Sequence, residues 1–272
     1  MRQYIDSPND VDWSSFWVER LTGKKNKDWD KVAPGFYKRT HKEDYPDILF
    51  DKLILDENDI VLDVGCGEGS VTISLAKKVK KVIGLDSSPK MLEYLEKRAK
   101  ENNVENIETV LKPIEEISYD EIGDVDVVVC SRSLNGIIPI EEVLFELNKI
   151  ASKYVFITIF GPENKKIEKD FDKELGIKTE DFPDYNYLFN ILFNMGIYAN
   201  IERFDLNNYR EYDSIDEAMD NGKFRLDLYT NEEKELLRKY LERILTCENG
   251  KYFNVKDKAD WIMVWWKKQE EK

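Results

Sequence analysis

Three glycines at alternate positions, Gly65, Gly67 and Gly69, follow a short apolar run that ends in Asp63. Glycine adopts the positive φ angles that a tight turn needs, and it lets a bound molecule approach the backbone closely. A helical pattern begins directly after the glycines and would present its unpaired amide groups to that molecule. About twenty residues later a second apolar run ends in Asp86, which is placed to accept hydrogen bonds from two ribose hydroxyls. The pattern predicts an α/β fold that binds a nucleoside.

The spacing of the glycines argues against a dinucleotide as the ligand. A dinucleotide site has the pattern Gly-x-Gly-x-x-Gly, whereas Ser70 stands here where the third glycine would be. The acidic Asp63, two residues before the first glycine, disfavours a phosphate group and favours a cationic one. We therefore expect a nucleoside with a small polar tail.

Apolar runs alternate with helical patterns through the centre of the chain, which is typical of βαβ units and a parallel sheet. The flanks have no such alternation, and aromatic residues concentrate in them. These patterns predict four segments: an N-terminal helical cap over 1–57, a cofactor-binding core over 58–160, an inserted lid over 161–197, and strands and helices that complete the sheet over 198–272.

Composition limits the function classes. The formal net charge is -14, which argues against DNA or RNA as the main partner, because nucleic acid is bound mainly through Lys and Arg. The three cysteines and one histidine form no metal-ligand pattern and no disulfide framework, so no metal is expected. No apolar run reaches the roughly 20 residues that cross a bilayer, and the first residues lack a secretory h-region. A cytoplasmic protein without a membrane partner is expected.

The stretch from Val61 to Gly69, with the acidic strand end at Asp86, resembles motif I and the following acidic motif of the class I S-adenosylmethionine-dependent methyltransferases. The resemblance implies a seven-stranded, mostly parallel Rossmann-like sheet with an antiparallel last strand, here Trp261–Trp266 beside Tyr198–Leu206. It also implies S-adenosylmethionine as the cofactor and S-adenosylhomocysteine as the product.

Carried over residue by residue, the resemblance places the three glycines at the methionine moiety, Asp63 at its amino end and Asp86 at the ribose. Lys112 stands where the family commonly has an Asp that contacts adenine, so this chain departs from the family there. The predicted cofactor-binding residues are Asp63, Gly65, Cys66, Gly67, Gly69, Asp86, Ser87, Met91, Ile114, Ser131 and Arg132.

The sequence indicates the acceptor only by class. The acidic charge and the aromatic flanks favour a small organic molecule, methylated by direct displacement. The alternatives are a protein methyltransferase and a non-catalytic module that binds S-adenosylmethionine. Tyr37 and His41, the only histidine, are the predicted catalytic residues, and Trp17, Tyr185 and Tyr187 the predicted substrate contacts. No oligomeric state is predicted.

Overall fold

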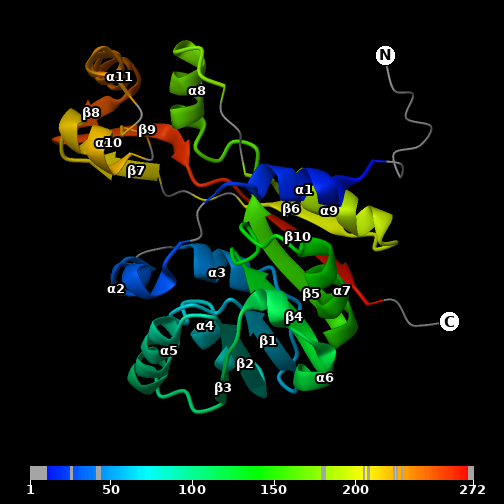
Figure 1. Cartoon of the computed structure of the whole chain (residues 1–272). Helices are drawn as coiled ribbons and strands as arrows, with labels where there is room; N and C mark the ends of the chain where they lie inside the picture. The colour runs from blue at the N-terminus through cyan, green and yellow to red at the C-terminus, as the bar shows by residue number, and fades with distance from the viewer. Residues whose placement is uncertain are drawn as a thin grey trace. The chain divides into compact units, whose positions relative to one another are not determined.

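Seven strands form the main sheet of the computed structural model, in the order β3-β2-β1-β4-β5-β10-β6 (Figure 1). Strand β10 runs antiparallel to both of its neighbours, β5 and β6, and the other pairs are parallel. The predicted fold class is therefore confirmed, including the antiparallel last strand. The strands are β1 (Ile60–Val64), β2 (Lys81–Asp86), β3 (Ile107–Leu111), β4 (Val125–Ser131), β5 (Ala151–Phe160), β6 (Asn200–Arg203) and β10 (Trp261–Lys267).

The structure describes residues 11–24, 27–40, 44–178, 182–204, 206, 209–222, 224, 226–227 and 229–268. The side chains at positions 39, 40 and 221 lie outside this description.

Helices cover both faces of the main sheet (Figure 1). Helices α4 (Thr72–Ala76) and α5 (Pro89–Glu101) lie on one face, and α6 (Tyr119–Ile122) and α7 (Ile140–Ile150) on the other. Strands buried on both faces need apolar side chains throughout, which explains the continuous apolar runs in β1 and β4. The chain leaves β1 towards β3 and then returns to β4, so the carboxyl ends of β1 and β4 meet where the strand order reverses. Ligands bind at such a point in open α/β sheets.

In the described part of the chain before β1 there are three helices: α1 (Trp13–Leu21), α2 (Trp29–Thr40) and α3 (Tyr45–Phe50). Helix α1 packs against α7 and against α9 (Tyr185–Asn194). Helix α2 packs along α5 and was not predicted, because Pro34 interrupts its helical pattern.

A second compact unit is built from residues 162–181 and 205–260. Its described elements are α8 (Lys166–Glu174), β7 (Tyr209–Tyr212), α10 (Ile215–Asn221), α11 (Asn231–Ile244), β8 (Thr246–Glu248) and β9 (Lys251–Lys258). The strands form an antiparallel sheet in the order β7-β9-β8. Phe171 lies at the centre of its apolar core, with its ring 5.1 Å from that of Tyr240 and 5.7 Å from that of Tyr229. Thr230 and Glu233 form a capping box at the start of α11.

The limits of the two units differ from the four predicted segments. The first unit holds residues 1–161, 182–204 and 261–272, so the segment predicted as one lid, 161–197, is divided between the units. Helix α9 belongs to the first unit because it returns the chain from β5 to β6 and buries Leu188, Ile191 and Leu192 in the main core. Among the residues of 198–272 that the structure describes, β6 and β10 are the strands that complete the main sheet. None of the described helices has the length and apolar character needed to cross a membrane.

Candidate functional site

The glycine loop lies in close contact with its surroundings. Gly65 and Gly69 have φ angles of 70° and 86°. A Cβ atom added to Gly65 would lie 2.4 Å from Cβ of Ser133, and one added to Gly69 would lie 2.3 Å from Cδ1 of Leu95. The loop is therefore held between the chain after β4 and helix α5, and its tight turn leaves no room for side chains at either position.

Asp86 connects the glycine loop to the start of α5. Its Oδ2 accepts a hydrogen bond from the amide of Gly67 at 2.9 Å, and its Oδ1 accepts one from the amide of Ser88 at 2.8 Å. Burial raises the pKa of this carboxyl above its usual value. Each carboxylate oxygen has two lone pairs, so each retains the capacity to accept a further hydrogen bond. Asp86 thus fits the two ribose hydroxyls that the resemblance assigns to it.

Asp63 is the residue before the last of β1 and is almost fully buried, with 1% of its surface exposed. Its Oδ2 accepts a hydrogen bond from the hydroxyl of Thr72 at 2.7 Å, whereas its Oδ1 has no partner among the described residues. Burial raises the pKa of this carboxyl to about 7, and the nearby charges of Asp86 and Glu68 add to the effect. A buried carboxylate oxygen without a donor is unfavourable. A ligand with an ammonium group would supply the donor, so the site fits the amino end of S-adenosylmethionine.

Two buried apolar side chains lie beside the same loop. Cδ1 of Ile114, in the short 3-10 helix η2 (Ile114–Glu116), would be 3.2 Å from a Cβ atom at Gly65. Sδ of Met91 would be 3.9 Å from a Cβ atom at Gly67. Both side chains therefore lie beside the glycine loop. Lys112, which departs from the family, forms an ion pair with Glu121.

Cys66 and Ser87 differ from the other predicted cofactor residues. The side chain of Cys66 is buried in an apolar cluster with Leu92 and Leu95, and burial raises the pKa of its thiol well above the usual value. Its amide donates to the carbonyl of Leu85 at 3.0 Å. Cys66 thus acts as a packing residue, while Ser87 is exposed beside Asp86.

A hydroxyl cluster that the sequence did not predict lies at the carboxyl ends of β4 and β5. The phenol of Tyr45 is hydrogen-bonded to Oγ of Ser131 at 3.0 Å and to Oγ1 of Thr158 at 2.5 Å. The guanidinium of Arg132 lies over the Tyr45 ring, 4.0 Å from its centroid. Thr158 was the available signal, since it is a hydroxyl residue in the otherwise apolar second half of β5.

The structure places the predicted substrate contacts in the core. Trp17 is fully buried, and its indole Nε1 donates to the carbonyl of Ile137 at 2.6 Å. Tyr185 and Tyr187 are partly buried on α9 and pack against the same core. Trp13 lies edge-on to Tyr187, with 5.8 Å between the ring centroids. These aromatic side chains pack the helices against the sheet, because α9 is a crossover helix and not part of a separate lid.

Tyr37, a predicted catalytic residue, contacts the last turn of α5. Its phenol donates to Oε2 of Glu101, in the last turn of α5, at 2.6 Å, and its ring stacks on Tyr94 at 4.7 Å. The last turn of α5 lies far along the helix from Ser88, so Tyr37 attaches α2 to the side of α5. His41, the other predicted catalytic residue, lies outside the described residues.

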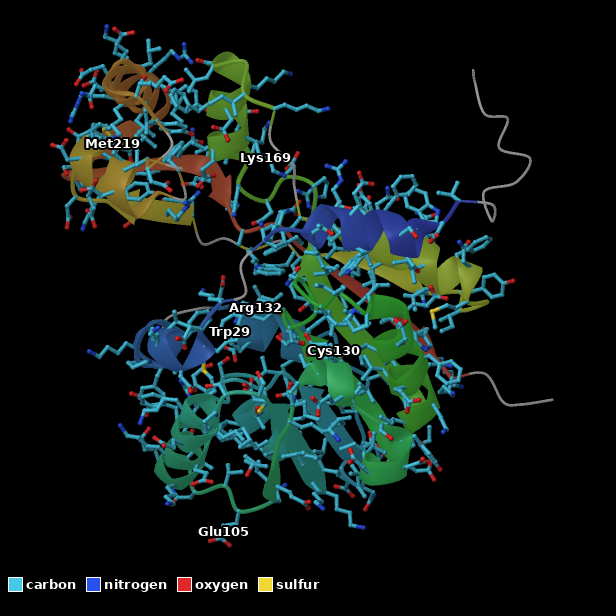
Figure 2. The ribbon with its side chains drawn as sticks, in the orientation of Figure 1. Trp29, Glu105, Cys130, Arg132, Lys169 and Met219 are labelled. Atoms are coloured by element: carbon cyan, nitrogen blue, oxygen red, sulfur yellow. The ribbon has the colours of Figure 1, made fainter. Side chains whose placement is uncertain are left out.

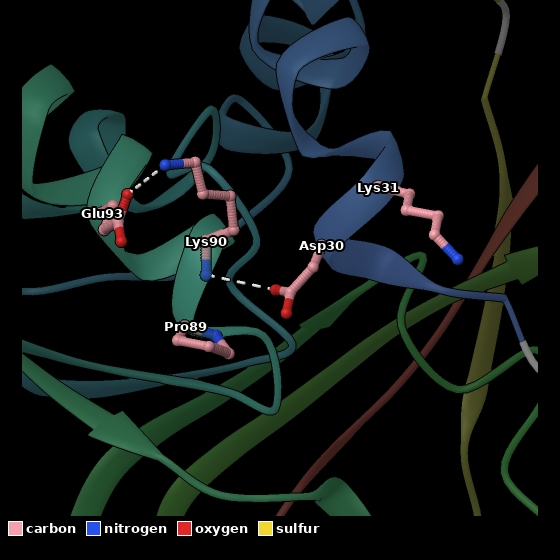
Figure 3. Close-up of a pocket in the computed structure, with 5 residues that line it drawn as sticks. All are labelled: Asp30, Lys31, Pro89, Lys90 and Glu93. Atoms are coloured by element: carbon pink, nitrogen blue, oxygen red, sulfur yellow. Dashed lines mark hydrogen bonds and ion pairs between the residues drawn. The ribbon is translucent and has the colours of Figure 1, made fainter.

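A hollow of about 350 Å³ lies where α2 meets the start of α5 (Figure 3). Oδ1 of Asp30 accepts hydrogen bonds there from the hydroxyl of Ser88 at 2.5 Å and from the amide of Lys90 at 3.2 Å. Figure 3 shows Lys31 pointing away from this contact. The contact attaches the first turn of α2 to the N-terminus of α5. The hollow is lined by Asp30, Lys31, Pro89, Lys90 and Glu93.

Comparisons with known proteins indicate a methyltransferase domain in the part of the chain that holds this site. Residues 55–186 match a family model described as a methyltransferase domain. An uncharacterized protein of Haemophilus influenzae is 26% identical over 223 residues, which cover 82% of this chain and 81% of that protein. A ubiquinone biosynthesis O-methyltransferase of Acinetobacter baumannii is 36% identical over 77 residues, 28% of this chain and 32% of that enzyme. This chain therefore spans about a third of the length of that relative.

The fold is also similar to solved structures. A candidate methyltransferase of Bacillus halodurans is 17% identical, with a TM-score of 0.54, over 83% of this chain and 99% of that one. At this level of identity the likeness concerns the fold. Within the described ranges, no group of three or more His, Cys, Asp or Glu side chains is arranged to hold a metal ion.

Proposed function

We propose that this chain, whose residues 55–186 match a methyltransferase domain, is a class I, Rossmann-like methyltransferase that transfers the methyl group of S-adenosylmethionine to a small organic acceptor by direct displacement. The observation that carries the proposal is the contact between Ser133 and Gly65. This contact brings the chain after β4, with its polar side chains, beside the glycine loop. The hydroxyl of Ser133 is thereby next to the glycine loop, where the resemblance expects the methionine end of the cofactor.

The residues of the site have separate tasks in the proposed reaction. When bound, the cofactor supplies a methyl group on a sulfonium leaving group, so the bond from carbon to sulfur breaks as the bond to the acceptor forms. Asp63 holds the ammonium group and Asp86 the ribose, which fixes the position of the reacting carbon. Such a displacement depends mainly on alignment and on the exclusion of water.

Tyr45 is a hydrogen-bonding residue in this proposal. Burial raises the pKa of its phenol above the usual value, so the phenol remains protonated at neutral pH. It therefore donates a hydrogen bond and does not remove a proton from the acceptor. An acceptor that holds a proton on the reacting atom would need another base.

The test is the fate of a labelled methyl group. Wild-type protein and methyl-labelled S-adenosylmethionine are incubated separately with a small-metabolite extract, a protein fraction and an RNA fraction. We expect label in the small metabolites. Label in protein or RNA alone would contradict the proposal, and the former would favour the protein methyltransferase. Tight binding of S-adenosylhomocysteine without transfer to any fraction would favour the non-catalytic module.

Two variants control this experiment. Asp86→Ala removes the acceptor of the Gly67 and Ser88 amides as well as the predicted ribose contact, so we expect at least about tenfold weaker cofactor binding and correspondingly less label. Asp120→Ala removes an exposed carboxylate on α6, outside the site, and should leave both quantities unchanged. Equal transfer by the two variants would mean that the ribose lies elsewhere.

A further inference from the structure

The hydroxyl cluster around Tyr45 has a fixed direction of hydrogen bonding. The amide of Arg132 donates to Oγ1 of Thr158 at 2.9 Å, so Thr158 accepts there and must place its own hydrogen elsewhere. Thr158 is 1% exposed, and among the described residues its one other hydrogen-bond partner is the phenol of Tyr45, at 2.5 Å. Thr158 therefore donates to Tyr45, because a buried hydroxyl hydrogen without an acceptor is unfavourable.

This direction leaves one hydrogen unused at Ser131. The phenol of Tyr45 has a single hydrogen, which it donates to Oγ of Ser131 at 3.0 Å. Ser131 therefore accepts from Tyr45, and within the part of the chain that the structure describes its own hydrogen has no acceptor. Ser131 is partly exposed at the carboxyl end of β4, between Cys130 and Arg132, which Figure 2 labels. Its hydroxyl is thus available as a donor to a ligand.

A second hydroxyl without a partner lies two residues further along the chain. Oγ of Ser133 is buried and forms no hydrogen bond with the described residues. It would lie 3.2 Å from a Cβ atom at Gly65, so it lies against the start of the glycine loop. A buried hydroxyl in this position is unfavourable for the same reason as the unpaired oxygen of Asp63. A ligand that accepts a hydrogen bond would relieve it.

The two unused donors lie beside the unpaired anion. Asp63 pairs with Val129 across β1 and β4, so the residues two positions further on, Gly65 and Ser131, lie at the same level of the sheet. Alternate residues of a strand point to the same face, so the side chains of Asp63 and Ser131 share one face. The charge of Asp63 also contributes to the raised pKa of Tyr45, the partner of Ser131. Such a site suits a molecule that carries a positive and a negative group close together.

We propose that the hydroxyls of Ser131 and Ser133 bind the carboxylate at the amino-acid end of S-adenosylmethionine, with Tyr45 and Thr158 as positioning residues. The cofactor carries its ammonium and its carboxylate on one carbon atom, so the groups that bind them must be neighbours. Asp63 supplies the anion for the ammonium, and the two hydroxyls supply hydrogens to the carboxylate. The inference deepens the proposed function and rests on it for the identity of the cofactor.

The test compares two ligands that differ only in the carboxylate. The full chain is titrated in a calorimeter with S-adenosylhomocysteine and with decarboxylated S-adenosylhomocysteine, which keeps the adenosine and the ammonium. We expect the wild type to bind the first ligand at least about tenfold more tightly than the second. Ser131→Ala and Ser133→Ala should each reduce this ratio by about three- to tenfold and leave the affinity for the decarboxylated ligand unchanged.

Matched substitutions near the amino end of β5 serve as controls. Ser152→Ala removes an exposed hydroxyl there and Tyr154→Phe removes a phenol hydroxyl, and both variants should keep the wild-type ratio. Tyr45→Phe keeps the aromatic ring but no longer donates to Ser131, whose hydroxyl then loses its fixed direction. We expect the ratio to fall by about threefold in this variant. An unchanged ratio would overturn the positioning role of Tyr45 and Thr158.

Thermal unfolding separates a binding role from a structural one. Because Oγ of Ser133 is buried without a partner, Ser133→Ala should not lower the thermal midpoint of the ligand-free chain. At one fixed concentration of S-adenosylhomocysteine, the rise in midpoint should be smaller in this variant than in the wild type. A lower ligand-free midpoint with an unchanged rise would assign Ser133 to packing and overturn its role at the carboxylate.

The titrations also separate failure of this inference from failure of the proposed function. Equal affinity of the wild type for both ligands would overturn the carboxylate site and leave S-adenosylmethionine as the cofactor. An equal loss of both affinities in the serine variants, or an unchanged ratio in both of them, would have the same meaning. If the wild type bound neither ligand, the proposed function would fall together with the inference.

Discussion

The carboxyl group of Asp63 is buried, and one of its oxygens accepts no hydrogen bond from the described residues. With its pKa at about 7, it is mostly protonated at pH 6 and mostly ionised at pH 7.5. An ammonium ligand binds the ionised form, so the affinity for S-adenosylhomocysteine should rise about eightfold between these pH values. Calorimetry should show this rise in the wild type and its absence in Asp63→Asn. A pH-independent affinity in the wild type would exclude this contact.

The same carboxyl also makes stability depend on pH. Its pKa in the folded state lies above the ordinary value of 3.8, so its contribution to the free energy of unfolding is fully present below pH 4 and is lost as the pH rises through 7. Without cofactor, Asp63→Asn should therefore exceed the wild type in thermal midpoint by more at pH 8 than at pH 5.5. This trend serves as the control, because it reports the burial of Asp63 independently of any ligand.

Among the residues of the site, the sequence predicted the ones whose positions follow from the order of the strands along the chain. Asp63, the glycines and Asp86 lie together because two neighbouring parallel strands end at one edge of the sheet. Tyr45 could not be predicted in this way. It reaches Ser131 and Thr158 across 86 and 113 positions of the chain, and its own neighbourhood has no motif. Contacts of this kind depend on tertiary packing, which periodicity does not encode.

The glycine loop offers a comparison of two substitutions in one element. Gly65→Ala adds a Cβ atom 2.4 Å from Ser133 at a positive φ, so we expect it to reduce the free energy of unfolding by about 2–5 kcal/mol. At Gly67 the nearest atom, Sδ of Met91, would lie 3.9 Å away, so Gly67→Ala should cost only about 1–2 kcal/mol for its left-handed backbone. Urea unfolding without cofactor measures both. Equal losses in the free energy of unfolding would show that the chain after β4 moves to make room for the Cβ atom added at Gly65.

Helix α2 is the element for which the predicted and observed roles differ most. Tyr37 attaches it to α5 through Glu101 and Tyr94, so the residue supports packing. We expect Tyr37→Phe to keep methyl transfer and cofactor affinity at the wild-type level, and Tyr37→Ala to lower the thermal midpoint because it also loses the stacked ring. The transfer rate into the labelled small metabolites checks this. A tenfold slower rate for Tyr37→Phe with unchanged stability would restore its predicted catalytic role.

Helix α9 shows why the predicted segments did not match the compact units. This helix runs from Tyr185 to Asn194, within the segment predicted as a lid. The periodicity of hydrophobic residues in a segment does not indicate which sheet the helix packs on, however. The long interval between β5 and β6 therefore appeared as one insertion, although its second half is the crossover helix of the main sheet.

The charge of the whole molecule bears on its partners. With a formal net charge of -14, the chain lacks the excess of cations that phosphate backbones require. We expect no binding to tRNA or duplex DNA in a gel shift at low-micromolar protein and about 150 mM salt. A shifted band that persists at this salt concentration would contradict the expectation and favour a nucleic-acid acceptor.

The way the chain connects the two compact units allows one of them to be removed. Phe160 pairs with Trp261 across the main sheet, and its ring lies 6.4 Å from that of Phe182. The amide of Phe204 donates to the carbonyl of Trp261 at 3.0 Å. Both gaps left by removing 162–181 and 205–260 are thus short enough for small glycine linkers.

We expect this shortened chain to fold and to bind S-adenosylhomocysteine with the affinity of the full chain. The reason is that the glycine loop, Asp63 and Asp86 all belong to the retained unit, whose core is separate from that of the removed one. Circular dichroism and calorimetry measure folding and affinity. An unfolded product or a lost cofactor site would contradict the independence of the two cores. Methyl transfer to the labelled small metabolites is measured in parallel: its loss with full cofactor affinity would assign acceptor recognition to the second unit, and its retention would confine the reaction to the first.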